Sequence, residues 1–153
     1  MERISGIMDP RCIRLELTAR DKEGVVRELV GLLVGAGRLG GGVEGYVAEV
    51  MEREGICSTG IGRGIAIPHR LVEGVEGIVM AVGRSGRGVA FDSVDGKPAH
   101  LVFLIIGPQG QNNDYLKVLG SLSRHLNDRA FFEALMRAGS ADEVVELVRE
   151  RER

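Results

Sequence analysis

The chain contains 153 residues, of which 44% are hydrophobic and 27% are charged, a balance typical of a globular domain that buries a core. Its formal net charge is −2 and only 4% of its residues are aromatic, which argues against a nucleic-acid-binding protein. No apolar run reaches the roughly 18 residues of a membrane span, and the first nine residues lack the apolar centre of a signal peptide. We therefore expect a cytoplasmic protein that forms one domain over residues 1–153 and does not insert into a membrane.

The cysteine and histidine positions argue against disulfides and metals. Cys12 and Cys57 are the only cysteines and lie far apart in the sequence. The three histidines, His69, His100 and His125, show no spacing typical of metal ligands. We expect neither a metal site nor a cofactor.

The first half of the chain shows strand and then helix periodicity. The expected elements are a half-buried strand over 13–17, a helix over 25–33 with Thr18 as its N-cap and Gly37 after its end, a glycine hinge at 40–42, and a second helix from Val43 that ends at Gly55. Residues 56–64 have the composition of a loop.

In the second half, short apolar runs alternate with helical patterns. The expected elements are short strands over 65–67, 78–82 and 89–91, a strand over 101–106, helices over 116–126 and 131–136, and a last helix that Ser140 and Glu143 cap. We expect Pro68 to end ladder pairing after the first of these strands. Interleaved strands and helices with short connections predict an α/β fold, a mixed β-sheet flanked by helices on both faces.

The segment between the second helix and the next strand has the composition of an anion site. Gly60, Gly62 and Gly64 allow sharp turns that expose several backbone N–H groups in one concavity, and Ser58 and Thr59 add hydroxyl donors. We expect these five residues to bind phosphate. The spacing of the glycines matches neither a Walker A motif nor a dinucleotide-binding fingerprint.

A histidine follows this segment on a stiffened backbone. Pro68 fixes its own φ and favours an extended conformation at Ile67, so His69 is presented from a restrained backbone. A neutral imidazole, with an ordinary pKa of about 6.5, is a competent nucleophile for phosphoryl transfer. From the residues alone, a structural turn and a phosphorylation site both remain open.

Five segments of the chain, taken in order, resemble one family. These are Arg53-Glu54, the run from Ser58 to His69 with its Gly-Ile-Ala-Ile-Pro-His core, the segment from Phe91 to Pro98, the strand from Leu101 to Pro108, and the helix from Leu116 to Ser123. They resemble the mannitol/fructose-type enzyme IIA (EIIA) domains of the bacterial phosphoenolpyruvate-dependent phosphotransferase system, including the nitrogen-regulatory EIIA proteins. The resemblance covers residues 13–148.

The resemblance implies a function for this chain. His69 would accept a phosphoryl group from the phosphocarrier protein HPr or a paralogue and pass it to an enzyme IIB (EIIB) domain in sugar uptake. Arg53 would hold the phosphate or orient the site. The alternative is a stand-alone regulatory protein of the nitrogen-type system, whose phosphorylation state controls the binding of a target protein. A degenerate anion-binding module that never carries phosphate is a third reading.

One position departs from the family pattern. Family members usually carry a second histidine where this chain has Tyr115, directly before the Leu-Lys-Val-Leu segment. A tyrosine donates one hydrogen bond but is a poor proton acceptor near neutral pH. Tyr115 therefore either takes over part of the histidine's role, with slower transfer, or merely caps an exposed helix end.

Several other residues near the motif admit a plain structural reading. We expect Cys57 to be half-buried and inert, His100 to be a structural or strand-edge residue, and His125 to lie partly exposed on its helix. Arg63 and Arg70 either add positive potential to the site or only keep the loop soluble. Of the three isoleucines at 61, 65 and 67, at least two should lie in the core.

Overall fold

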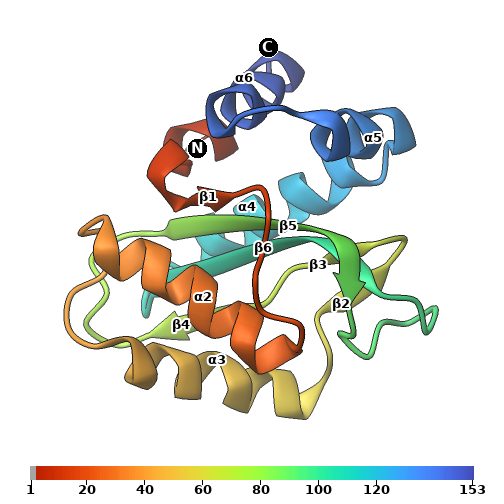
Figure 1. Ribbon diagram of the computed structural model, residues 1–153. Helices are drawn as coiled ribbons and strands as arrows, with labels where there is room; N and C mark the ends of the chain where they lie inside the picture. The colour runs from red at the N-terminus through yellow and green to blue at the C-terminus, as the bar shows by residue number, and fades with distance from the viewer. Residues whose placement is uncertain (1–2) are drawn as a thin grey trace.

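The computed structural model describes residues 3–153 as a mixed sheet with helices on both faces, which confirms the expected class (Figure 1). In chain order the elements are α1 (Ile4–Ile7), the short 3₁₀ helix η1 (Pro10–Cys12), β1 (Ile13–Arg14), α2 (Lys22–Gly35), α3 (Val43–Ile56), β2 (Gly60–Gly62), β3 (Ile65–Ala66), β4 (His69–Val72), β5 (Val79–Val89), β6 (Ala99–Pro108), α4 (Asn112–Leu126), α5 (Arg129–Arg137) and α6 (Ala141–Arg151).

The sheet is organised around β6. Its strands run in the order β1-β5-β6-β3-β2, and β4 also pairs with β6. β5 and β6 are antiparallel, whereas β3 and β4 both lie parallel to β6 on the same side. The segment that contains the Pro-His pair therefore runs along the central strand of the sheet.

Pro68 does not end ladder pairing, contrary to our expectation. Its carbonyl oxygen accepts a hydrogen bond from the Ile105 amide at 3.0 Å, and β4 continues directly after it with His69 aligned to Ile105. A proline is tolerated here because it precedes the first residue of the strand, where the ladder uses its carbonyl and needs no N–H.

Side chains alternate between the two faces of the sheet and build two cores. On β6, Phe103 and Ile105 pack with α1, α4, α5 and α6 on one face. Val102 and Leu104 pack with α2 and α3 on the other. Figure 1 shows the orange and gold helices below the sheet and the blue helices above it. Burial on both faces explains why the strand over 101–106 reads as a continuous apolar run.

Helix ends show where the sequence pattern was insufficient. The N-cap of α2 is Asp21, whose carboxylate accepts from the Gly24 amide at 2.8 Å; Thr18, our expected cap, instead donates to Glu28. Gly37, with φ of +73°, follows the end of α2 as predicted. Ser140 caps α6 by accepting from the Glu143 amide at 3.1 Å, also as predicted.

Strand lengths and the first elements differ more from expectation. β1 covers only Ile13 and Arg14, and β5 extends to Val89, so no separate strand forms over 89–91. α1 and η1 were not predicted from the sequence. α1 is held against the last helix, because the amides of Ile4 and Ser5 donate to the Glu152 carboxylate at 2.7 and 3.0 Å.

Candidate functional site

His69 is the first residue of β4, and a backbone contact fixes its ring. Its Nδ1 lies 2.5 Å from the carbonyl oxygen of Ile67. A carbonyl oxygen can only accept, so Nδ1 carries the proton that it donates, and in the neutral ring the lone pair is left on Nε2. The sequence predicted a stiffly held imidazole, and the structure identifies the nitrogen that is free to react.

The surroundings of His69 favour its neutral form. The ring is half-buried, and this burial lowers its pKa below the usual value, with a further lowering from the nearby positive charge of Arg53. The hydrogen bond to Ile67 and the negative charge of Glu54 act in the opposite direction on that pKa but do not overcome the burial. Near neutral pH the imidazole is therefore uncharged, with the lone pair of Nε2 available.

Tyr115 lies beside this ring. The ring centroids of Tyr115 and His69 are 5.9 Å apart, with the planes tilted by 58°. Tyr115 lies in the first turn of α4 and is only 5% exposed, so the reading of an exposed helix cap is wrong. Its hydroxyl finds no hydrogen-bond partner among residues 3–153, and burial raises its pKa, so it remains a neutral donor.

Arg53 completes the group from the last turn of α3. Its Nη1 donates to the carbonyl oxygen of Cys57 at 2.8 Å, which fixes the side chain where the helix passes into the loop. Besides burial, which shifts each pKa most, the positive charge of Arg53 lowers the pKa of both His69 and Tyr115. His69, Arg53 and Tyr115, expected from the sequence, are thus brought together from three different elements.

Glu54 is a buried carboxylate that organises the site. It is 6% exposed, and it accepts from the Thr59 amide at 3.1 Å, from the Thr59 hydroxyl, and from Lys22 Nζ at 2.9 Å. Lys22 also pairs with Asp92 at 3.2 Å. Sequence reasoning noted the Arg53-Glu54 pair but assigned Glu54 no role, because its charged partner, Lys22, lies thirty-two residues away at the start of α2.

The expected ring of free amides before His69 needs correction. The Thr59 amide donates to Glu54, the Gly60 amide to Ser58 Oγ at 3.0 Å, and the Arg63 amide to Asp95 at 2.9 Å. The Ser58 hydroxyl itself donates to the Phe91 carbonyl. These groups stabilise the loop internally, and the sequence could not reveal the contacts to Phe91 and Asp95 because both acceptors lie more than thirty residues away.

Two of the expected glycines contact a different region of the molecule. Gly62, Arg63 and Gly64 have φ values of +90°, +60° and +84° and form the turn between β2 and β3. A side chain added at Gly62 would meet Asp95 at 3.3 Å, and one added at Gly64 would meet the Phe132 ring at 3.0 Å. Glycine is thus needed at positions 62 and 64, both for the positive φ of the turn and for close packing against Asp95 and Phe132.

Other residues near the motif behave as follows. Ile65 and Ile67 are buried whereas Ile61 is 45% exposed, as expected for two core positions among three. Cys57 is exposed, so the expectation of a half-buried thiol is wrong. Arg70 pairs with Glu49 and Glu52 of α3.

Neither a metal-binding cluster nor a membrane-spanning helix is found among the residues that the structure describes. Within 3–153, no group of three or more His, Cys, Asp or Glu side chains is placed to hold a metal ion. In the same range, no helix has both the length and the apolar character that a membrane crossing requires.

Comparison with known protein families shows to which family this chain belongs. Residues 6–151 match the family model described as phosphoenolpyruvate-dependent sugar phosphotransferase system, EIIA 2. The chain belongs to this EIIA family. The match covers all the elements that position His69, Arg53 and Tyr115, so the resemblance noted in the sequence is confirmed at the level of the family.

Among curated relatives, the EIIA domain is similar to proteins named for two different processes. It is 37% identical over 147 residues to the fructose-specific EIIA component of Haloferax volcanii, covering 96% of this chain and 95% of that one. It is 33% identical over 142 residues to the nitrogen regulatory protein of Bradyrhizobium diazoefficiens, covering 92% and 91%. It also matches the fructose-specific EIIABC component of Bacillus subtilis at 36% identity, but spans only 24% of that protein.

Among solved structures, both nitrogen-regulatory and sugar-specific IIA proteins resemble this chain. The nitrogen regulatory protein IIA-Ntr of Neisseria meningitidis superposes on this EIIA domain with a TM-score of 0.88 at 31% identity, covering 95% of this chain and 98% of that one. The mannitol IIA of Escherichia coli superposes with a TM-score of 0.77 at 29% identity, covering 92% and 98%. A complex of the mannitol IIA with phosphorylated IIB, also from Escherichia coli, matches at a TM-score of 0.78 and 28% identity, covering 94% and 98%.

Proposed function

We propose that this EIIA domain is a cytoplasmic phosphocarrier that holds a phosphoryl group on Nε2 of His69. The observation that carries the proposal is the contact between Nδ1 and the Ile67 carbonyl, because it leaves the lone pair of the neutral ring on Nε2. The lowered pKa of His69 supports the same conclusion, since a protonated ring has no lone pair to offer.

The proposed reaction is a transfer between two imidazoles. Nε2 of His69 attacks the phosphorus of a phosphohistidine on an HPr-like donor. The new N–P bond forms as the donor N–P bond breaks, and the bonding electron pair returns to the donor imidazole. In the second step a nucleophile of the acceptor forms a bond to phosphorus as the Nε2–P bond breaks, and the bonding electron pair returns to the His69 ring. No co-reactant is needed, and catalysis rests on positioning and on charge stabilisation of the phosphoryl oxygens.

Arg53 and Tyr115 are the proposed partners of those oxygens. A guanidinium beside the imidazole offers charge-assisted hydrogen bonds to a phosphoryl group. The Tyr115 hydroxyl lacks a partner among residues 3–153, so it has a donor to offer, and its raised pKa keeps the proton in place. Tyr115 supplies the donor that the family's usual histidine provides, but it accepts no proton.

This proposal changes the role of the residues that the sequence suggested as phosphate ligands. These are Ser58, Thr59, Gly60, Gly62 and Gly64. Ser58 donates to Phe91, Thr59 donates to Glu54, and the Arg63 amide between the glycines donates to Asp95, so this loop shapes the site in our proposal and phosphate binding is left mainly to Arg53. The Glu54–Thr59 contact is the main connection, because it joins the helix that carries Arg53 to the loop that leads to His69.

The acceptor in this proposal is an EIIB domain. Two findings support it: the fructose-specific EIIA component of Haloferax volcanii has nearly the same length as this chain, and the similar mannitol IIA of Escherichia coli forms a complex with phosphorylated IIB. The donor would be HPr or a paralogue. The donor and His69 would then both carry phosphohistidine, and the similar free energies of the two N–P bonds would make the transfer reversible.

The second candidate is a regulatory protein of the nitrogen type, whose phosphorylation state controls the binding of a target protein. The TM-score of 0.88 with IIA-Ntr of Neisseria meningitidis favours it, as does the 33% identity to the nitrogen regulatory protein of Bradyrhizobium diazoefficiens. Both candidates use the same phosphohistidine and differ only in what reads it.

The shared step is tested by incubating the protein with phosphoenolpyruvate, enzyme I and HPr. We expect a mass increase of one phosphate group that is labile in acid and stable in base, present in wild type and in His100→Ala and absent in His69→Ala. Label retained in His69→Ala would refute the assignment. Unlabelled wild-type protein, with a known EIIA domain labelled in parallel, would refute the phosphocarrier function itself.

The two candidates are separated by what consumes the phosphoryl group. Labelled protein is mixed with a fructose-type EIIB domain, and transfer of the label within one turnover favours sugar uptake. Retention of the label, together with a binding partner that is captured by the unphosphorylated form and released by the phosphorylated form, favours regulation. His69→Ala serves as the permanently unphosphorylated control in both arms.

A further inference from the structure

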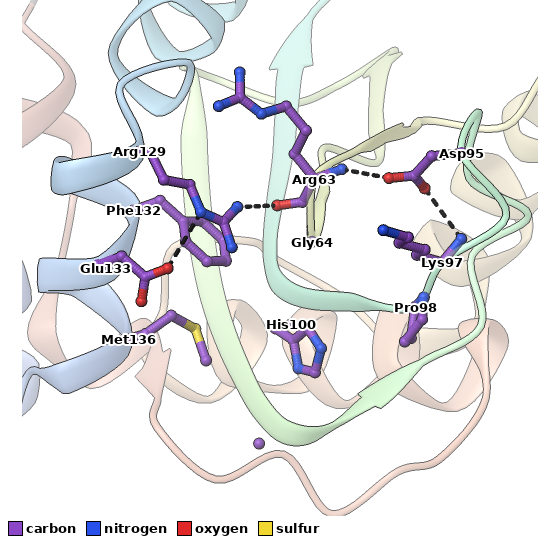
Figure 2. Close-up of a pocket in the computed structure, with 11 residues that line it drawn as sticks. Arg63, Gly64, Asp95, Lys97, Pro98, His100, Arg129, Phe132, Glu133 and Met136 are labelled. Carbon is purple, nitrogen blue, oxygen red and sulfur yellow. Dashed lines mark hydrogen bonds and ion pairs between the residues drawn. The ribbon is translucent and has the colours of Figure 1, made fainter.

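A second pocket lies at the opposite end of β6 from His69. It has a volume of about 620 Å³ and lies among the β2–β3 turn, the loop before β6, the start of β6 and one side of α5 (Figure 2). His100 lines it five positions before Ile105, the β6 residue aligned with His69. At about 3.3 Å per strand residue, roughly 17 Å separates the two positions. The pocket is therefore distinct from the phosphohistidine site.

Two cationic side chains reach this pocket from opposite sides. Lys97 comes from the loop before β6, and Figure 2 shows its side chain extending across the pocket. Arg129 comes from α5 and lies with its guanidinium carbon 4.3 Å from the centre of the Phe132 ring. Arg63 also lines the pocket, but its guanidinium points away and donates to Asn127 at 2.6 Å.

The two carboxylates at the pocket are already engaged. Asp95 accepts from the backbone amides of Arg63 at 2.9 Å and Lys97 at 3.0 Å. Glu133 pairs with Arg129 Nε at 3.2 Å, and a second nitrogen of Arg129 donates to the Arg63 carbonyl at 3.0 Å. Among residues 3–153, no carboxylate lies within ion-pair distance of Lys97. Its ammonium group is therefore available to a ligand, as are the remaining donors of Arg129.

His100 adds a third polar group at the pocket floor. Its Nδ1 lies 2.8 Å from the carbonyl of Ser85, so this nitrogen donates, and in the neutral ring Nε2 keeps a lone pair that can accept a hydrogen bond from a hydroxyl group of a ligand. The apolar part of the lining comes from Phe132, Met136 and Pro98. A few convergent polar groups over an apolar wall, in a volume within the range of about 300–1,000 Å³, are typical of small-molecule sites.

We propose that this pocket binds a small phosphate monoester, such as a phosphorylated polyol or sugar. A tetrahedral phosphate has three terminal oxygens and accepts hydrogen bonds from widely separated directions, as the opposed Lys97 and Arg129 require, while a hydroxyl group on the carbon portion of the ligand donates to Nε2 of His100. A carboxylate accepts in one plane and carries a single charge, which fits opposed cations less well. The carbon portion of the ligand lies against Met136 and Pro98.

The proposal is tested by titrating the unphosphorylated, ¹⁵N-labelled full chain with glycerol 3-phosphate. We expect saturable shifts of the amide signals of Gly64, Gly86, Lys97 and His100, with those of His69 and Tyr115 unmoved. Glycerol, the same carbon body without the charge, should produce no shifts. Because the protein carries no phosphohistidine in this experiment, the result is independent of the function proposed for His69.

Two variants identify the groups involved. Lys97→Gln removes a charge that forms no ion pair with residues 3–153, and we expect affinity to fall about tenfold or more, as for loss of a charged hydrogen bond. Lys117→Gln, an exposed lysine on α4, is the matched control and should bind like wild type. His100→Asn keeps a donor near Ser85 and removes Nε2, so it should weaken binding several-fold.

Three results would overturn the proposal. One is the absence of saturable shifts with glycerol 3-phosphate. Another is shifts confined to the surroundings of His69 and Tyr115, which would assign the anion to the phosphohistidine site. The third is equal affinity of wild type and Lys97→Gln while both give the amide spectrum of the folded chain, since the loop lysine would then contribute nothing.

Discussion

His69 combines burial with a fixed proton position, and both follow from its place at the start of β4. The Ile67 carbonyl two residues earlier holds the proton on Nδ1, and partial burial disfavours the charged ring. In the reaction we propose, the backbone thus prepares the nucleophile before any partner arrives.

The first prediction concerns the pH dependence of phosphate acceptance. Because the pKa of His69 lies below its usual value of about 6.5, the rate should stay constant as the pH falls through 6.5 and decline only at more acidic pH. An NMR titration of the His69 ring gives the pKa directly. Arg53→Gln should raise this pKa because it removes a lowering charge, and a pKa of wild type at or above 6.5 would contradict the prediction.

The same shift affects stability in a defined direction. The unfolded chain, with its histidine pKa near 6.5, takes up a proton more readily than the folded chain does. The contribution of His69 to the free energy of unfolding is therefore fully present above pH 6.5 and is lost progressively as the pH falls from there toward the lowered pKa of the folded state.

The second prediction concerns Tyr115. Its buried hydroxyl has no hydrogen-bond partner within the described part of the chain, residues 3–153, and leaving such a group unpaired costs about 1–3 kcal/mol. Tyr115→Phe should therefore raise the free energy of unfolding by about 1 kcal/mol while slowing phosphate acceptance. Chemical denaturation and single-turnover phosphorylation measure the two effects. Tyr115→His should accept phosphate faster than wild type. Unchanged phosphorylation rates in both variants would show that Tyr115 does not act on the phosphoryl group.

At the scale of the elements, the connection between α3 and β2 carries the third prediction. Thr59 donates to Glu54 through both its amide and its hydroxyl inside the protein. Thr59→Val keeps the amide but removes the hydroxyl, and should lower the free energy of unfolding by about 1–3 kcal/mol. Thr59→Ser, which keeps the hydroxyl, is the control. Equal stability of Thr59→Val and wild type would show that the hydroxyl contributes nothing.

How far the sequence predicts these elements depends on the range of the interactions. Strand β6 and helices α4 to α6 were anticipated because their patterns are long and regular. The strand after Pro68 was missed because His69–Val72 does not alternate, and its pairing depends on β6, over thirty residues away. The same limit applies to the glycine loop, whose amides bind Glu54 and Asp95 from other segments.

The candidate site was recovered to a similar extent. His69, Arg53 and Tyr115 were found through the motif and the family pattern, and they lie together in the structure. Glu54 and Lys22 were not assigned, because an isolated glutamate and lysine in two separate helices carry no signal of a buried pair. The pocket at Lys97 and His100 was also beyond reach, since five separate segments form it.

At the scale of the whole molecule, one strand supports both cores. Leu104 is fully buried against α2 and α3, whereas its neighbours on β6 face the opposite helices. We predict that Leu104→Ala lowers the free energy of unfolding by about 2–5 kcal/mol. Chemical denaturation tests this, and the surface change Leu116→Ala on α4, at a residue that is 62% exposed, should cost far less.

The central claim is that Nε2 of His69 forms the bond to phosphorus. Long-range ¹H–¹⁵N NMR of the phosphorylated protein, labelled with ¹⁵N in its histidine rings, reports the attached nitrogen. We predict phosphorus on Nε2, with the proton retained on Nδ1 and directed at the Ile67 carbonyl. Phosphorus on Nδ1, or on the ring of His100 or His125, would contradict the account.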